Sequence, residues 1–212
     1  MSNSQKSPSP IAGFYAVDQE KNINRAIKQM VEALNTYAST YGISWYGAAD
    51  RRVDANENVF PALYQLNSKD WVNCLANDQW KGYGFFDLTD PVRYVSPGID
   101  GGISKTRTSI ISQDIALVVY GDIDQLLHKQ GLSASTDYRY SKQLIESQIV
   151  KVLQRRLKGV RGFFDLQRVY SDRITDVFKT YTIKDRGEYL YLPKFGFRFE
   201  GELTVTEQCN NS

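Results

Sequence analysis

The chain has 212 residues, which is long enough to bury a sizeable core without disulfides or metals. Its 26 Lys and Arg nearly balance its 24 Asp and Glu, which excludes a general attraction to nucleic acid or to an anionic membrane. No apolar run approaches the ~18 residues of a membrane span, and the first residues lack the apolar segment of a signal peptide. We therefore expect a soluble protein that is made inside a cell.

The composition predicts three parts of very different size. Residues 1–17 are rich in Ser and Pro and are expected to form a flexible arm that a partner would order. A single domain is expected over residues 18–208, with a short tail at 209–212. Cys74 and Cys209 have no metal-ligand spacing, and we expect reduced thiols rather than a lone bridge.

The first predicted element is an amphipathic helix. Apolar residues recur at intervals of three and four from Ile23 to Tyr41 and would form one stripe. Asp18 or Asn22 can cap its start, and Gly42 is a typical residue to end it.

Several short strands are expected after this helix. Their apolar content predicts strands or edge segments over residues 43–49, 58–66, 70–75 and 82–88. The residues between the first two, ADRRVDANEN, are expected to form a polar connection. Pro61 has no N–H to donate, so the strand that contains it is not expected to be central.

The middle of the chain contains the most apolar strand. Both faces are apolar from Arg107 to Tyr120, which predicts a central strand buried on both sides. A Gly-rich loop is expected before it at 91–105, and a turn or short helix after it. A second amphipathic helix is expected from Ser141, a possible cap, to Leu157, and two further strands are possible within 162–185.

In the last segment, KFGFRFEGELTVTEQ, the apolar side chains fall on odd positions and the polar ones on even positions from Lys194 to Thr206. Gly201 could mark a hairpin, but a two-residue turn there would mix apolar and polar faces, so a continuous strand with a bend is favoured. The order of elements then predicts an α+β fold, with an antiparallel or mixed sheet and two amphipathic helices packed on one face.

Candidate catalytic and metal-binding residues are few. His128 has no nucleophile or orienting partner in a recognisable motif, and a surface position at a helix end is favoured. Asp122 and Asp124 could hold Mg²⁺ in a small hydrolase, although capping a helix or turn explains them better. A calcium loop starting at Asp54 lacks the required Gly and the bidentate Glu. We expect no cofactor and no enzymatic activity.

Two other features suggest contacts with partners. The second helix carries a basic face, which could be solvated or could contact an acidic neighbour or DNA phosphate; its residues are Lys151, Arg155 and Lys158. The Gly-rich loop, with Asp100 and Lys105, could be a mobile loop or could project into a partner or a lumen. A nucleic-acid-binding module that uses the basic face is one alternative function.

The order and sequence character of these elements resemble those of the neck and tail-completion proteins of tailed bacteriophages. These proteins include head–tail connector rings and tail terminators. The matching segments are NINRAIKQMVEALNTYAS, VFPALYQLNSKDWVNCLANDQWKGYGFFDL, SIISQDIALVVYGDID, LIESQIVKVLQRRL and YLPKFGFRFEGELTV. The resemblance extends to proteins from crAss-like phages.

The resemblance implies a structural virion protein, assembled in the host cytoplasm, that forms a homo-oligomeric ring of six or twelve copies. It implies portal, neck or tail proteins as neighbours, DNA that passes through the lumen without sequence-specific binding, and no membrane partner. The polar face of the last strand would then contact the next subunit; the candidate residues are Arg198, Glu200, Glu202 and Thr204.

Overall fold

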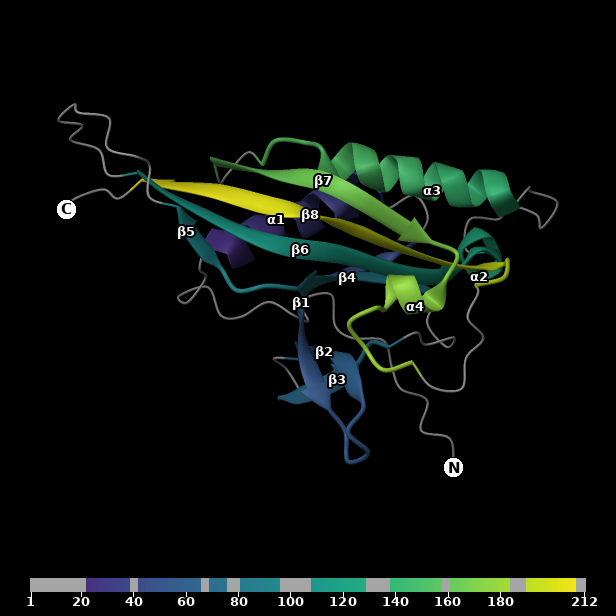
Figure 1. The fold of residues 1–212 in the computed structure, drawn as a ribbon. Coiled ribbons are helices and arrows are strands. Elements are labelled where there is room, and N and C mark those ends of the chain that lie inside the picture. The colour runs from purple at the N-terminus through teal and green to yellow at the C-terminus, as the bar shows by residue number, and fades with distance from the viewer. Residues whose placement is uncertain are drawn as a thin grey trace.

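A mixed β-sheet with helices on both of its faces forms the body of the protein (Figure 1). The computed structural model describes residues 22–38, 42–65, 69–75, 81–95, 108–128, 138–157, 161–183 and 190–208. The helices in this part of the chain are α1 (Asn22–Tyr37), α2 (Ile123–His128), α3 (Tyr138–Leu153) and α4 (Ile174–Val177). The strands are β1 (Ser44–Val53), β2 (Val59–Gln65), β3 (Asp70–Asn73), β4 (Gly82–Leu88), β5 (Arg93–Val95), β6 (Thr108–Asp122), β7 (Arg161–Ser171) and β8 (Lys194–Gln208).

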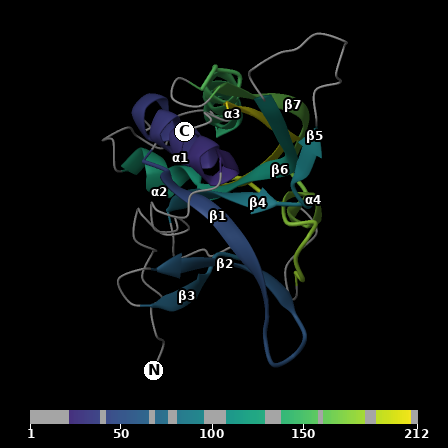
Figure 2. The ribbon, with the colours of Figure 1, turned by 90° about the vertical axis from the view of Figure 1, so that its left-hand side faces the viewer.

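The strand order is β3-β2-β1-β4-β6-β8-β7, with β5 paired to β6. Only β1 and β4 pair in parallel among these strands, and the other pairs are antiparallel. β6 and β8 pair along their whole length, from Thr108 opposite Gln208 to Asp122 opposite Lys194. The first three strands twist away from the body, so that the β1–β2 hairpin projects from it, toward the bottom of Figures 1 and 2.

The main core lies between the sheet and helices α1 and α3. The odd-numbered residues of β8 point into it, including Phe195, Phe197 and Phe199, all of which are fully buried. Burying an aromatic or aliphatic side chain of this size stabilises the fold by roughly 1.5–3 kcal/mol. The predicted α+β fold with two helices on one face of the sheet is therefore confirmed.

A second core lies on the opposite face of the sheet, at one end only. The α4 segment supplies Ile174, Val177 and Phe178, which pack against Tyr120 of β6 and against aromatic residues of β4. Thr182, just after α4, exchanges hydrogen bonds with Val59 at the start of β2. The α4 segment thus fixes the hairpin strands to the body.

The last strand is continuous, as predicted. Gly201 lies opposite Ile115 of β6 and Leu166 of β7, next to a bulge in β7. A Cβ atom on Gly201 would lie 2.1 Å from the carbonyl oxygen of Asp165. Glycine is needed here because the backbone of β7 approaches it too closely for any side chain.

Several predicted boundaries were wrong. β1 continues to Val53 through residues that were expected to form a connection, because it pairs with β2 as a hairpin. β2 lies between β3 and β1 although it contains Pro61, whose carbonyl accepts the Cys74 N–H at the end of the ladder (2.8 Å). Ser141 lies inside α3 and is buried, so it is not the cap.

One predicted strand also needs correction, and the predicted end of the first helix lies outside the described residues. The second possible strand within 162–185 is replaced by α4 and a turn, since Ile174 and Val177 cover the sheet as one helical turn. In the described residues α1 ends at Tyr37, and Tyr41 lies outside them.

Candidate interaction surface and buried ion network

Two kinds of polar site occur on the sheet face that lies opposite α1 and α3. The even-numbered residues of β8 point to this face, and they include the four predicted interface residues. Near α4 the face is covered and holds a buried ion network. Further along, β5, β6, β8 and β7 carry charged side chains that are partly exposed.

Arg198 is at the centre of the buried network. Its side chain is fully buried, and its Nη2 lies 2.9 Å from Oδ2 of Asp87, whose side chain is 1% exposed. Its Nε lies 2.6 Å from Oε1 of Glu200. Arg198 therefore holds β8 against β4 and is not available at the surface for the subunit contact predicted from the sequence.

Asp87 accepts more than one charge-assisted contact. The hydroxyl of Thr180 donates to its Oδ2 at 2.8 Å, and Arg51 of β1 lies 3.5 Å from its Oδ1. A buried carboxylate is stabilised only when paired and hydrogen bonded in this way. Burial, together with the nearby Asp87 carboxylate, raises the pKa of Tyr181.

Glu200 connects the buried network to solvent. Its side chain is 18% exposed and lies 2.6 Å from Nζ of Lys179, which follows α4. Burial alone would raise the pKa of Glu200, but the hydrogen bonds from Lys179 and Arg198 outweigh it and lower that pKa. A polar hollow of about 440 Å³ opens beside this carboxylate and reaches Arg51 and Arg168.

Glu202 belongs to a row of three carboxylates that cross the sheet. Asp114 of β6, Glu202 of β8 and Asp165 of β7 lie directly opposite one another in register. Arg93 of β5 is close to two of them, at 2.8 Å from Asp114 and 3.3 Å from Glu202. Like charges opposite one another destabilise a sheet, so this acidic row (Asp114, Glu202 and Asp165) has an unfavourable excess of negative charge.

Thr204 lies one row further along the same face. It pairs between Ser112 of β6 and Phe163 of β7, and Phe163 is 53% exposed. Among the described residues, the α4 segment covers only the other end of this face (Figure 1). Glu202 and Thr204 are therefore placed where a neighbouring molecule could contact them.

The basic face of α3 lies on the opposite side of the sheet. Lys151 and Arg155 are exposed, and the guanidinium of Arg155 stacks over the ring of Tyr37 from α1, 3.7 Å from its centroid. A groove of about 310 Å³ runs between the ends of the two helices. The other predicted contact residues, Asp100, Lys105 and Lys158, lie outside the described residues.

The carboxylates considered for catalysis have structural partners. Oδ1 of Asp122 accepts the backbone N–H of Gln125 at 3.2 Å in the first turn of α2, and the hydroxyl of Tyr138 donates to Asp124 at 2.7 Å. Asp54 accepts two backbone N–H groups and the side-chain amide of Asn58 within a tight turn. These contacts explain the residues without a metal ion.

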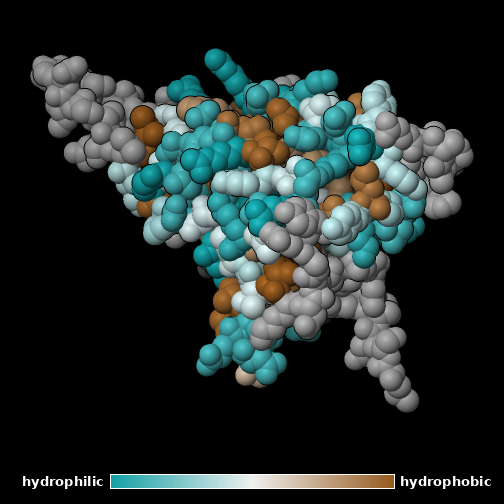
Figure 3. All heavy atoms as spheres, turned by 45° about the vertical axis from the view of Figure 1, so that its right-hand side comes forward, coloured by the Kyte–Doolittle hydropathy of each residue, from teal (hydrophilic) through white to brown (hydrophobic). Residues whose placement is uncertain are grey.

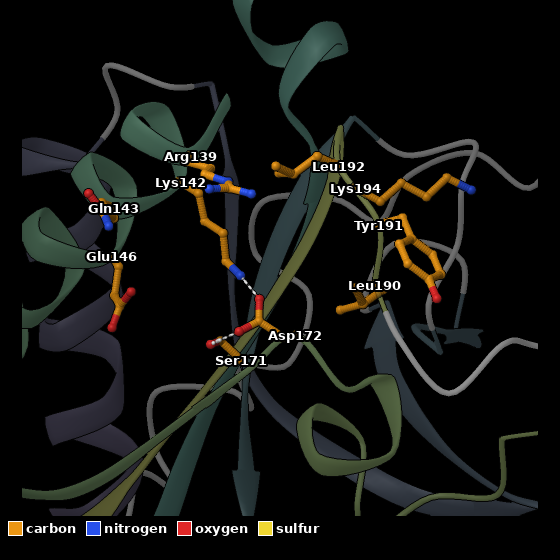
Figure 4. A pocket seen from close by; sticks show the side chains of 10 residues that line it. All are labelled: Arg139, Lys142, Gln143, Glu146, Ser171, Asp172, Leu190, Tyr191, Leu192 and Lys194. Carbon is orange, nitrogen blue, oxygen red and sulfur yellow. Dashed lines mark hydrogen bonds and ion pairs between the residues drawn. The ribbon is translucent and has the colours of Figure 1, made fainter. Parts of the chain in front are cut away.

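A hollow of about 620 Å³ lies between α3 and the start of β8 (Figure 4). Lys142 of α3 pairs with Asp172, and the hydrogen bond from Lys142 lowers the pKa of that carboxyl. The Asp172 carbonyl also accepts the Leu190 N–H at 2.6 Å. Asp172 therefore joins α3, the end of β7 and the segment before β8, which the sequence pattern did not predict.

The surface is suited to polar contacts. In the view of Figure 3 the described surface is mostly hydrophilic, and hydrophobic residues form small separate patches. None of the described helices is long and apolar enough to cross a membrane. Within the same residues, no group of three or more His, Cys, Asp or Glu side chains could hold a metal ion.

Neither protein-family models nor curated proteins match this sequence. The surfaces described above are therefore the basis for a functional assignment.

Proposed function

We propose that the protein is a structural virion protein that forms a homo-oligomeric ring in the head–tail region of a tailed phage. In this position it joins head to tail or terminates the tail. The observation that supports this proposal is the acidic row on a partly uncovered sheet face, with basic residues on the opposite helical side of the molecule.

Opposite charges on opposite sides favour a contact between unlike surfaces of two copies. The acidic row carries three carboxylates and, among the residues that the structure describes, has one arginine within ion-pair distance. The C-terminal end of α3 and the residues just after it carry Lys151, Arg155 and Arg156. A heterologous contact of this type produces a closed ring when the rotation between copies is a fraction of a full turn.

A neighbouring copy would relieve the repulsion within the acidic row. Asp165 and Glu202 face each other across β7 and β8, and Arg93 can neutralise only part of the row. A basic surface placed over this row would add favourable charge pairs and would fix the orientation of the two copies. DNA in the lumen of such a ring would be held without sequence-specific contacts.

Light scattering and negative-stain microscopy of the purified protein test this proposal. We expect a discrete ring-sized mass for the wild-type chain and loss of that mass for Glu202→Lys. Glu146→Lys is the matched control, because it reverses an acid on α3, away from the acidic row. A monomer at every protein concentration, or a ring that Glu202→Lys leaves intact, would argue against the proposal.

A further inference from the structure

The β1–β2 hairpin has a fixed and exposed tip. Residues 51–57 are all exposed, and Val53 exposes 62% of its surface. The Asp54 carboxylate accepts the N–H groups of Asn56 (2.8 Å) and Asn58 (2.9 Å), and backbone bonds close the turn. Val59 directly follows the tip, and its two hydrogen bonds with Thr182 hold this end of the hairpin to the body. A surface with so few conformations loses little entropy on binding.

Glu57 occupies a backbone conformation that normally favours glycine or asparagine. Its φ is 62°, which costs a residue with a side chain roughly 1 kcal/mol or more. Its carboxylate makes no hydrogen bond or ion pair with any part of the chain that the structure describes. Strain at an exposed position with no internal contact points to a role outside the chain.

The tip is acidic because the neighbouring arginines bind elsewhere. Arg51 contacts the buried Asp87, and Arg52 stacks over the ring of Trp71, 3.9 Å from its centroid. The tip itself, residues 53–58, contains Val53, Asp54 and Glu57 and no basic residue. It presents two apolar side chains, Val53 and Ala55, beside two carboxylates.

The groove between α1 and α3 has the complementary chemistry. Its floor contains apolar side chains, namely Met30, Ala33, Val152 and Leu157, and its rim carries Arg155 and Arg156 against a single acid, Glu32. Arg156 is exposed and has no hydrogen bond or ion pair within the described residues. At about 310 Å³ the groove is large enough for the tip of a turn but not for a whole strand pair.

We propose that the hairpin tip of one copy docks into the α1/α3 groove of the next copy, with Val53 on the apolar floor and Glu57 beside Arg156. The hairpin hangs below the sheet, and α1 and α3 lie on its other side (Figure 2), so a chain cannot dock its own tip. The contact is head-to-tail, as a ring requires. This inference rests on the self-association of the proposed function.

Charge reversal with rescue tests the contact. Glu57→Arg and Arg156→Glu each place like charges together and are expected to weaken self-association by about tenfold or more. The double variant restores the opposite charges, and so does a 1:1 mixture of the two single variants, because each tip then finds a complementary groove. Glu146→Arg is the control on α3, and circular dichroism confirms that every variant is folded.

A cross-link provides the second measurement. Val53→Cys and Ala33→Cys, placed in separate chains in a Cys209→Ser background, are expected to form a disulfide between copies on mild oxidation. The same variants with Lys69→Cys in place of Val53→Cys should not form it. Cys74 is fully buried and is not expected to interfere.

The outcomes separate this inference from the proposed function. A wild-type chain that never self-associates and gives no cross-link overturns both. A wild-type ring that tolerates both charge reversals overturns only the docking of the tip. An effect of Arg156→Glu without an effect of Glu57→Arg means that Arg156 has another partner, such as the acidic row of the next copy, and also overturns the docking of the tip.

Discussion

Arg198 and Asp87 form an ion pair of 2.9 Å in which neither side chain is more than 1% exposed. The two residues are 111 positions apart in sequence, and they join β8 to β4 across β6. Removal of one partner leaves the other charge buried and unpaired. The network therefore gives the first prediction about stability.

Arg198→Met is expected to lower the free energy of unfolding by about 3–5 kcal/mol, the usual cost of breaking a buried ion pair from one side. Asp87→Leu is expected to have a similar cost. The double variant should be less destabilised than the sum of the two, because neither of the two fully buried charges then remains without the other. Urea unfolding followed by circular dichroism measures all three.

The control for this cycle is Arg93→Met. Arg93 also contacts two carboxylates, but its side chain is 53% exposed. Exposed pairs contribute about 0–1 kcal/mol. A loss for Arg93→Met as large as that for Arg198→Met would mean that burial is not what makes the network important.

The lowered pKa of Glu200 predicts a dependence of stability on pH. The carboxylate is stabilised in the folded chain by Lys179 and Arg198, so its folded pKa lies below the ordinary value of 4.5. Its contribution is fully present above pH 4.5 and is lost as the pH falls through the lower folded value. We expect a smaller loss of stability between pH 6 and pH 3 in Glu200→Gln than in the wild-type chain.

Urea midpoints measured across this pH range check the prediction. Asp172 also has a lowered pKa, through its pair with Lys142, and contributes in the same direction below its ordinary value of 3.8. Asp172→Asn is therefore a second variant with an independent effect. Parallel stability curves for the wild-type chain and Glu200→Gln would contradict the role of Glu200.

The buried thiol of Cys74 gives a chemical prediction. Burial raises the pKa of this thiol well above its ordinary value, and the thiolate is the reactive form. In a Cys209→Ser background the folded protein is expected to react with a thiol reagent such as DTNB only after denaturant is added. Rapid labelling of the folded chain would mean that the β3 region opens readily.

The fold was predictable where the sequence pattern and burial agree. β4 was predicted to the residue, because an apolar run is bounded by a glycine and by polar residues, and every residue from Gly82 to Asp87 is buried. The end of β1 was missed, because Arg51 to Val53 are exposed and the polar sequence from Asp50 onward resembles a loop. Burial, and not strand propensity, therefore explains why β4 was predicted correctly and the end of β1 was not.

The ion network could not be predicted, because its members come from strands that are distant in sequence. A partial signal was available for Asp87, which is the single charge within the otherwise apolar strand β4, but not for Arg198, which is one of several charges on β8. Each is buried, which requires a partner of opposite charge. The sequence does not say that these two charges meet, since this follows from the positions of β4, β6 and β8 in the sheet.

The close contact at Gly201 gives the last prediction. A Cβ atom there would lie 2.1 Å from the Asp165 carbonyl oxygen and 2.8 Å from the Phe164 ring, and backbone cannot move aside as a flexible side chain can. Gly201→Ala is expected to cost about 1–3 kcal/mol or more, the range for overpacking a core. Gly82→Ala is the matched control: its Cβ would meet only side-chain atoms, the nearest at 3.0 Å on Leu126. Thermal unfolding of both variants should show the larger loss at Gly201, and equal losses would mean that the β7 bulge can move away from β8.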